Sequence, residues 1–176
     1  MTRRLLIFLL PMLLIASACG DKKGYRIECQ IEGLGDRGIE AIVTDGTTLG
    51  RTQIHPDKKG RLVIEGAAPR PVFIELFPMD GGAPLASLVA ADGDCIQLAL
   101  DPDAGLSTLR ITGNNQAMNE YGAWLAGADS LLRISDDDRA NRLITDFVDT
   151  HRDSPAAALA VATLYRTRGR ELRADS

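Results

Sequence analysis

Three glycines near the start of the chain have the spacing of a dinucleotide-binding turn. Gly33, Gly35 and Gly38 form G-x-G-x-x-G directly after a strand-like run. In folds that bind NAD, such glycines lead straight into a helix of a parallel βαβ unit. Here a short run rich in β-branched residues follows Gly38 and ends at the tight-turn pair Asp45-Gly46, whereas a parallel crossover needs about a dozen residues. We therefore expect a loop between antiparallel strands and no nucleotide ligand.

The other side chains that could do chemistry show no catalytic or metal-binding pattern. His55 and His151 lie far apart, and no histidine or cysteine pair has the spacing of zinc ligands. The aspartates in DGDC, DPD and SDDDR lack the alternating ligands and final glutamate of a calcium loop; they are typical of turns and helix starts. No serine lies in G-x-S-x-G. The sequence predicts no catalytic residue, metal ligand or cofactor, so we do not expect an enzyme.

The N-terminus has the organisation of a secretory signal. Residues 1–18 begin with Arg3 and Arg4, continue with an apolar run over residues 5–15 and end in small residues. The apolar run is shorter than the roughly 18 to 20 residues that span a bilayer as a helix, so it predicts a signal peptide that is removed. Paired arginines also begin twin-arginine signals, but an ordinary signal with a basic start explains them more simply.

A cysteine follows the small residues at the end of this segment. The stretch IASAC resembles the lipobox of bacterial lipoproteins, in which the cysteine, here Cys19, carries the lipid and becomes the first mature residue. Ala16 departs from that pattern, since leucine is commonest there; the alternative is cleavage after Ala18 without lipidation. Residues 19–24 are mostly polar or glycine, as in a flexible tether. We expect a lipid on Cys19 that anchors the protein to the outer or inner membrane, facing the periplasm.

Two further cysteines lie in the body of the chain. Cys29 and Cys95 do not form C-x-x-C, so the redox motif of a thioredoxin active site is absent. In an oxidising compartment they could form a structural disulfide between strands; the alternative is two independent small residues. Cys29 alternates with Ile27 and should face the core, whereas Cys95 alternates with Gln97 and should face away from it. This mismatch disfavours the pairing.

The larger part of the chain, residues 25–113, has the pattern of short strands. Runs such as YRIECQI and RLVIEG alternate between apolar and polar residues, as half-buried strands do. Glycine, proline and aspartate recur between the runs, which is typical of tight turns. About eight such runs at close intervals predict an antiparallel β-sandwich or barrel.

From residue 114 to residue 176 the period changes to that of helices, and the fold class becomes mostly β with a C-terminal α part. Met118, Tyr121 and Leu125 follow one another at helical spacing, with Trp124 beside them. Two more helices are expected after the N-capping serines of SDDDR and DSPAA. We expect about three helices that pack on the sandwich through Trp124 and Leu125.

Charge and aromatic content limit the classes of partner. The chain has a net charge of −4, and removal of residues 1–18 takes away two arginines and makes it more acidic. Without a basic cluster, an acidic chain does not favour nucleic acid as a partner. Aromatic residues make up 5% of the chain, which weakens the case for a large platform that stacks on sugars. The aromatic residues available for a concave binding face are Tyr25, Phe73, Phe77 and Trp124.

The order of these motifs resembles a domain of unknown function found at the N-terminus of lipid-anchored, thioredoxin-like proteins of Gram-negative bacteria. The matching stretches are that domain's first strand with its glycine loop, its hairpin, its strand–turn–strand, its exit into the helices and its helical linker: YRIECQIEGLGDRGIEAIV, DKKGRLVIEG, VAADGDCIQLALD, ITGNNQAMNEYGAWL and FVDTHRDSPAAALA. In family members the linker leads into a thioredoxin domain.

This chain departs from the family in three ways. Leu62 stands where an aromatic residue is commoner, and Cys95 stands where a small hydroxyl residue is usual. The sequence ends at Ser176, where a thioredoxin domain would begin, so the redox cysteines of the family's enzymatic half are missing. No catalytic residue can therefore be carried over.

Three functions remain open at this point. The first is a non-catalytic lipoprotein of the cell envelope that binds or docks a protein partner. The second is the targeting and docking half of a thiol–disulfide oxidoreductase, acting with a thioredoxin-like protein. The third is a sandwich that binds a glycan or a peptide.

Overall fold

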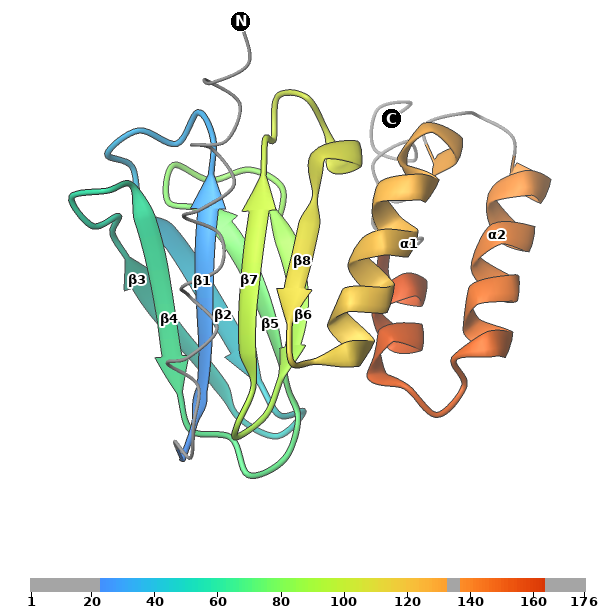
Figure 1. The fold of residues 1–176 in the computed structure, drawn as a ribbon, viewed down its shortest axis with the longest axis horizontal. Helices are drawn as coiled ribbons and strands as arrows, with labels where there is room; N and C mark the ends of the chain where they lie inside the picture. The colour runs from blue at the N-terminus through green and yellow to red at the C-terminus, as the bar shows by residue number, and fades with distance from the viewer. Residues whose placement is uncertain (1–22, 133–136, 164–176) are drawn as a thin grey trace, which may run out of the picture.

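The structure is a computed structural model that describes residues 23–132 and 137–163 (Figure 1). It confirms a mostly β fold with C-terminal helices: eight strands form two sheets, and helices follow them. The expected signal peptide of residues 1–18, Cys19, and residues 20–22 of the expected tether lie outside the described residues, as do residues 164–176.

Four strands form each sheet. In the first, sheet A, the order is β4 (Arg61–Gly66), β1 (Tyr25–Ile31), β7 (Cys95–Leu100) and β8 (Arg110–Gly113). In the second, sheet B, the order is β3 (Leu49–Ile54), β2 (Ile39–Thr44), β5 (Val72–Pro78) and β6 (Ala86–Ala90).

One strand pair departs from the expected antiparallel pattern. β1 and β7 are neighbours at the centre of sheet A but run parallel, with Ile27 opposite Ile96. A parallel pair needs a long connection between its strands, and here five strands intervene, four of them in sheet B. The other pairs are antiparallel.

The core lies between the two sheets. Alternate residues of each strand point inward, which gives burial patterns with a period of two in β1, β5 and β7. The inward side chains are aliphatic and almost fully excluded from water, among them Ile27, Leu62, Ile96 and Leu98 of sheet A and Ile39, Ile74, Leu76 and Leu88 of sheet B.

The glycines with dinucleotide-binding spacing lie in the connection from β1 to β2, as a loop and not before a helix. This loop carries the chain from sheet A to sheet B, so it is not a hairpin. Gly33 and Gly35 have φ of 71° and 59°, which glycine adopts readily. A Cβ on Gly38 would lie 2.5 Å from the Ile54 carbonyl oxygen and 2.6 Å from Met79 Sδ. Gly38 thus permits the close approach of neighbouring backbone.

The helix α1 (Gln116–Leu132) closes one open side of the sandwich (Figure 1). Its residues Met118, Tyr121 and Leu125 are buried in the same core cluster as the strands. The helix can approach β8 closely because residue 122 is glycine: a Cβ there would lie 2.8 Å from the Cβ of Ile111. The expected contact through Leu125 is confirmed.

Residues at the start of α1 also satisfy the backbone of β6, the edge strand of sheet B. The Val89 N–H donates to Met118 Sδ at 3.1 Å, and the Asn115 amide donates to the Val89 carbonyl oxygen at 3.2 Å. Asn115 also caps α1, since its Oδ1 accepts from the Met118 N–H. The helix therefore covers the edge strands of both sheets on this side.

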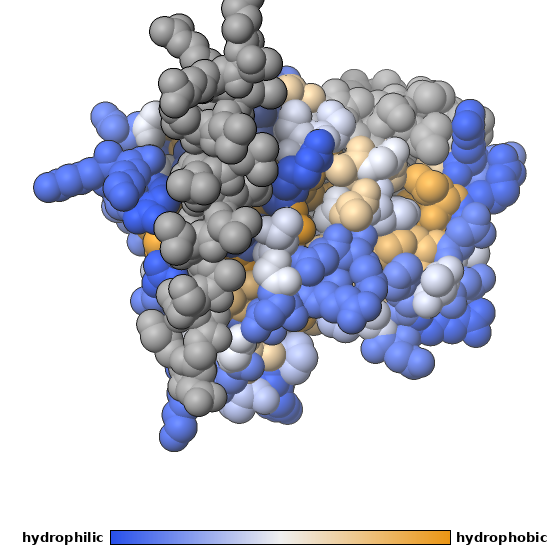
Figure 2. Space-filling view, in the orientation of Figure 1, coloured by the Kyte–Doolittle hydropathy of each residue, from blue (hydrophilic) through white to orange (hydrophobic). Residues whose placement is uncertain are grey.

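The second helix, α2 (Asp137–Thr150), and a helical segment over residues 155–163 pack beside α1. Trp124 faces α2 and stacks on Phe147 at 4.6 Å between ring centroids, and Phe147 stacks on His151 at 4.1 Å. Tyr121 and Thr163 share a hydrogen bond of 2.8 Å. Figure 2 shows hydrophobic residues gathered between the two helices.

We predict opposite effects of the same substitution at two glycines of α1. Gly122→Ala should lower the free energy of unfolding by about 1–3 kcal/mol, because the new methyl group overlaps Ile111. Gly127→Ala should raise it by about 0.5–1 kcal/mol, since that position is open and alanine favours a helix. Urea denaturation measures both, and equal stabilisation by the two variants would contradict the close packing of α1 on β8.

Candidate functional site on the outer face of sheet B

The two cysteines considered as a disulfide are not joined. Cys29 is a free, fully buried thiol, so the Cys29–Cys95 bond is absent. The register explains this, because Cys29 lies opposite Leu98 whereas Cys95 lies opposite Arg26, three residues away along β1 and on the other face. Burial, and to a smaller extent the nearby Glu28 charge, raises the pKa of the Cys29 thiol to about 12, so it is an inert core residue.

The four aromatic residues considered for a binding face do not lie together. Tyr25 is buried and covers Gly66, its cross-strand neighbour, and burial raises the pKa of its hydroxyl. Trp124 belongs to the helix interface. Only Phe73 and Phe77 share a surface, the outer face of sheet B, to which both project from β5.

Residues of three neighbouring strands form this outer face in rows. The registers place Leu49 beside Thr44 and Phe73, Arg51 beside Ile42 and Glu75, and Gln53 beside Glu40 and Phe77. Each row thus takes one residue from β3, one from β2 and one from β5. Apolar and charged side chains alternate over the face and are interleaved.

Exposed apolar side chains are concentrated here. Leu49 is 63% exposed, Phe73 37% and Met79 38%, and the only other large apolar residue exposed to this degree among the described residues is Val161, on the helical segment. Ile42 and Phe77 add half-buried apolar surface between them. Single exposed apolar residues are common, but a group on one face marks an interaction surface.

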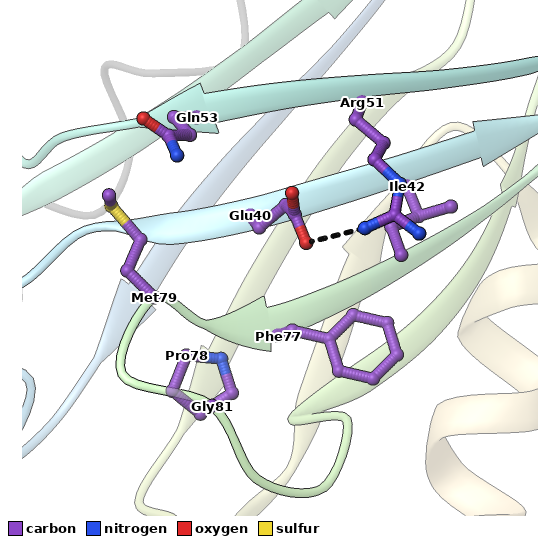
Figure 3. A pocket seen from close by; sticks show the side chains of 8 residues that line it. All are labelled: Glu40, Ile42, Arg51, Gln53, Phe77, Pro78, Met79 and Gly81. Carbon is purple, nitrogen blue, oxygen red and sulfur yellow. Dashed lines mark hydrogen bonds and ion pairs between the residues drawn. The ribbon is translucent and has the colours of Figure 1, made fainter.

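A shallow depression of about 290 Å³ lies within this face (Figure 3). Its volume is at the lower end of the range for small-molecule sites. Arg51 Nη1 lies 3.4 Å from Glu40 Oε2 in the middle of the depression. The residues that line it are Glu40, Ile42, Arg51, Gln53, Phe77, Pro78, Met79 and Gly81.

The loop at one rim of the depression is held against the β1–β2 connection. The Met79 N–H donates to the Gly38 carbonyl oxygen at 3.3 Å, and Arg37 Nη1 lies 2.7 Å from Asp80 Oδ2. The absence of a side chain at Gly38 leaves room for the sulfur of Met79. Gly38, the last glycine of the spacing that resembles a nucleotide-binding motif, therefore helps to position Met79.

A tight turn fixes the opposite end of β2 and β3. Asp45 Oδ1 accepts hydrogen bonds from the backbone N–H and the hydroxyl of both Thr47 and Thr48, at 2.7–3.0 Å. These bonds, that from the Thr48 N–H most of all, hold the pKa of Asp45 well below its usual range. The turn thereby sets the register in which Leu49 stands beside Thr44.

A second depression, of about 410 Å³, lies between β8 and α1. It is bordered mainly by small residues of the helix, including Gly122, Ala123 and Ala126. Its one cation, Arg110, donates to the carbonyl oxygens of Ser107 and Leu109. The guanidinium thus stabilises the local turn.

The two histidines lie far apart in the sequence, and they have different neighbours in the structure. His55 lies near Gly38 at the rim of sheet B, whereas His151 stacks on Phe147 and its Nε2 lies 3.5 Å from Glu120. Within residues 23–132 and 137–163, no three histidine, cysteine, aspartate or glutamate side chains gather as metal ligands do. In the same part of the chain, no helix has the length and apolar character needed to span a bilayer.

Comparison with known proteins gives no relative: no family model matches this chain, and no curated protein matches it. The resemblance to the domain of unknown function thus stays a prediction.

We predict that Asp45 contributes stability at neutral pH that is lost in acid. A group whose pKa is lowered by folding stabilises the fold above its unfolded pKa of about 3.9 and ceases to do so as the pH falls through its folded pKa. Asp45→Asn should therefore lower the urea midpoint at pH 7, and the difference from the wild type should shrink near about pH 3. Asp153→Asn, at an exposed aspartate with no side-chain hydrogen bond within the described residues, is the control. A difference independent of pH would contradict this role.

Proposed function

We propose that this protein is a non-catalytic lipoprotein of the cell envelope, anchored through Cys19 to the outer or inner membrane, whose sandwich docks a protein partner in the periplasm through the outer face of sheet B. One observation carries the docking proposal: Leu49, Phe73 and Met79 place exposed apolar surface on and beside a single face. The sequence of residues 1–19 carries the anchoring proposal.

The contrast between the two outer faces supports the choice of sheet B. The outer face of sheet A carries mainly charged and polar side chains, and Arg26 forms ion pairs with Glu28 and Glu65. Both faces belong to strands of the same sandwich and could equally be polar. The apolar character of one face alone therefore points to a contact made there.

The chemistry of the face favours a protein over a charged small molecule. Arg51 and Glu40 largely offset each other, and Phe73, Phe77 and Leu49 provide apolar area around them. Protein interfaces combine apolar and aromatic side chains with interspersed polar groups in this way. The resemblance noted from the sequence makes a thioredoxin-like protein the first partner to examine.

A glycan is the second candidate ligand. Phe77 lies beside Glu40 and Gln53 in one row, and an aromatic ring next to carboxylate and amide groups can stack on a sugar and accept hydrogen bonds from its hydroxyl groups. Two aromatic rings make a small platform, which is why we rank this function second.

We predict that Cys19→Ala releases the protein from membranes. Without the thiol no lipid can be attached, and residues 19–24 are too short and too polar to hold the chain in a bilayer. Fractionation of cells that produce the variant should move the protein from the membrane pellet to the periplasmic fraction. Full retention in the pellet would contradict lipid anchoring and leave the docking proposal untouched.

We predict site-specific crosslinking through the outer face of sheet B. A photoreactive benzoyl-phenylalanine in place of Phe73 should give a discrete adduct with one envelope protein in intact cells, because that ring is exposed at the proposed interface. The same group in place of Gln97, exposed on the outer face of sheet A, is the control. Adducts of equal yield at both positions would contradict a docking role of sheet B, and crosslinking to polysaccharide would favour the glycan.

A further inference from the structure

The strand β3 is the edge of sheet B that α1 does not cover. Within the described residues β3 pairs only with β2, whereas α1 bonds to the backbone of β6 at the other edge. Five of the six residues of β3 are exposed, and in β4, the edge of sheet A on the same side, only one is. The edge of β3 is therefore the more accessible of the two.

The backbone of β3 is suited to accept another strand. Every second residue of an edge strand directs its N–H and C=O groups away from the sheet, where they remain unpaired. Proteins usually protect such edges with proline, lysine, a bulge or a covering element. β3 has the sequence LGRTQI, without proline or lysine, and its pairing with β2 is continuous from Leu49 to Ile54.

The side chains of β3 indicate what an added strand would carry. Leu49 and Arg51 project to the same outer face, two residues apart, with 63% of Leu49 and 60% of the Arg51 side chain exposed. The contact of Arg51 with Glu40, at 3.4 Å, is longer than a strong charge-assisted hydrogen bond, and it uses one of five N–H groups. The guanidinium can therefore pair with an acidic side chain across the edge.

We propose that β3 binds an extended segment of the partner by strand addition, and that this segment carries an apolar residue opposite Leu49 and an acidic residue opposite Arg51. Main-chain hydrogen bonds would supply affinity, and these two cross-strand pairs would supply selectivity. The inference deepens the proposed docking function and rests on it, since the added strand would continue the same outer face.

A second copy of this chain is a poorer occupant. Two antiparallel β3 strands whose pairing is centred on Arg51 would bring this residue opposite the same residue of the other copy, and like charges in that position are destabilising. An acidic segment from another protein has the complementary charge.

The test uses the mature full-length chain and three short synthetic peptides in which threonine alternates with valine and the central residue is glutamate, glutamine or lysine. Fluorescence anisotropy should show saturable binding of the glutamate peptide, with roughly tenfold weaker binding of the lysine peptide. Arg51→Glu should reverse this order, and Arg51→Gln should make the peptides nearly equal. The variants must keep the circular dichroism spectrum and urea midpoint of the wild type.

Methylation of the peptide backbone distinguishes strand addition from other contacts. N-methyl groups on alternate residues block one edge of a strand, so methylation on one set should abolish binding and on the other set should leave it unchanged. Equal effects of the two sets, or no saturable binding of the glutamate peptide, would overturn the inference. Self-association in sedimentation experiments that Arg51→Glu abolishes would also overturn it, in favour of a second copy. The docking function itself would stand in each case if the crosslink at Phe73 is retained.

Discussion

The packing of one helix against the edges of both sheets is the constraint on which the rest of the molecule depends. A two-sheet sandwich has two open sides, and each presents the unpaired backbone of edge strands. α1 closes one side, where Asn115 and Met118 bond to the backbone of Val89 and Gly122 admits Ile111. The outer surface of α1 then carries Trp124, on which α2 packs. The helices therefore have a structural role, since they cover one pair of edge strands and extend the hydrophobic core.

Because α1 covers only one side of the sandwich, the two edges of sheet B differ in their exposure to solvent. At the edge next to α1, the N–H and C=O groups of Val89 are bonded by Met118 and Asn115, while β3 at the opposite edge is exposed over nearly its whole length. Between them, the outer face of sheet B grades from the buried Ser87 and Val89 of β6 to the exposed Leu49 of β3. Accessible backbone and accessible apolar side chains thus coincide in one region. That coincidence is what distinguishes this region from the outer face of sheet A, which has neither to the same degree.

Strands such as β1, β5 and β7 were predictable because they have one buried face, so residues such as Ile27 and Cys29 recur with a period of two. The pairing of the strands could not be predicted. The parallel contact of β1 with β7 depends on how the chain passes through both sheets, and local sequence patterns carry no information about that. The candidate site was only partly predictable. Phe73 and Phe77 were identified as aromatic candidates. Residue type alone, however, does not distinguish an apolar side chain on the outer face of a sheet from one in the core. For Trp124, helical spacing indicates a buried face without saying which element covers it, and the structure shows that Phe147 of α2 stacks on its ring.

The proposed anchor places limits on how a partner can reach β3. A tether of residues 19–24, fully extended, spans at most about 20 Å, so the end of the sandwich where β1 begins would lie close to the membrane. Figure 1 shows that β2 terminates at the end of the sandwich where β1 begins. Within β3, Leu49 next to the Asp45 turn would therefore lie nearest the bilayer and Ile54 farthest from it. Six residues of β3 cover about another 20 Å. A partner strand would therefore run away from the membrane surface. A soluble periplasmic protein can bind in this orientation without restriction. A protein anchored in the same leaflet could bind only if the linker between its anchor and the strand were at least as long as the tether of residues 19–24.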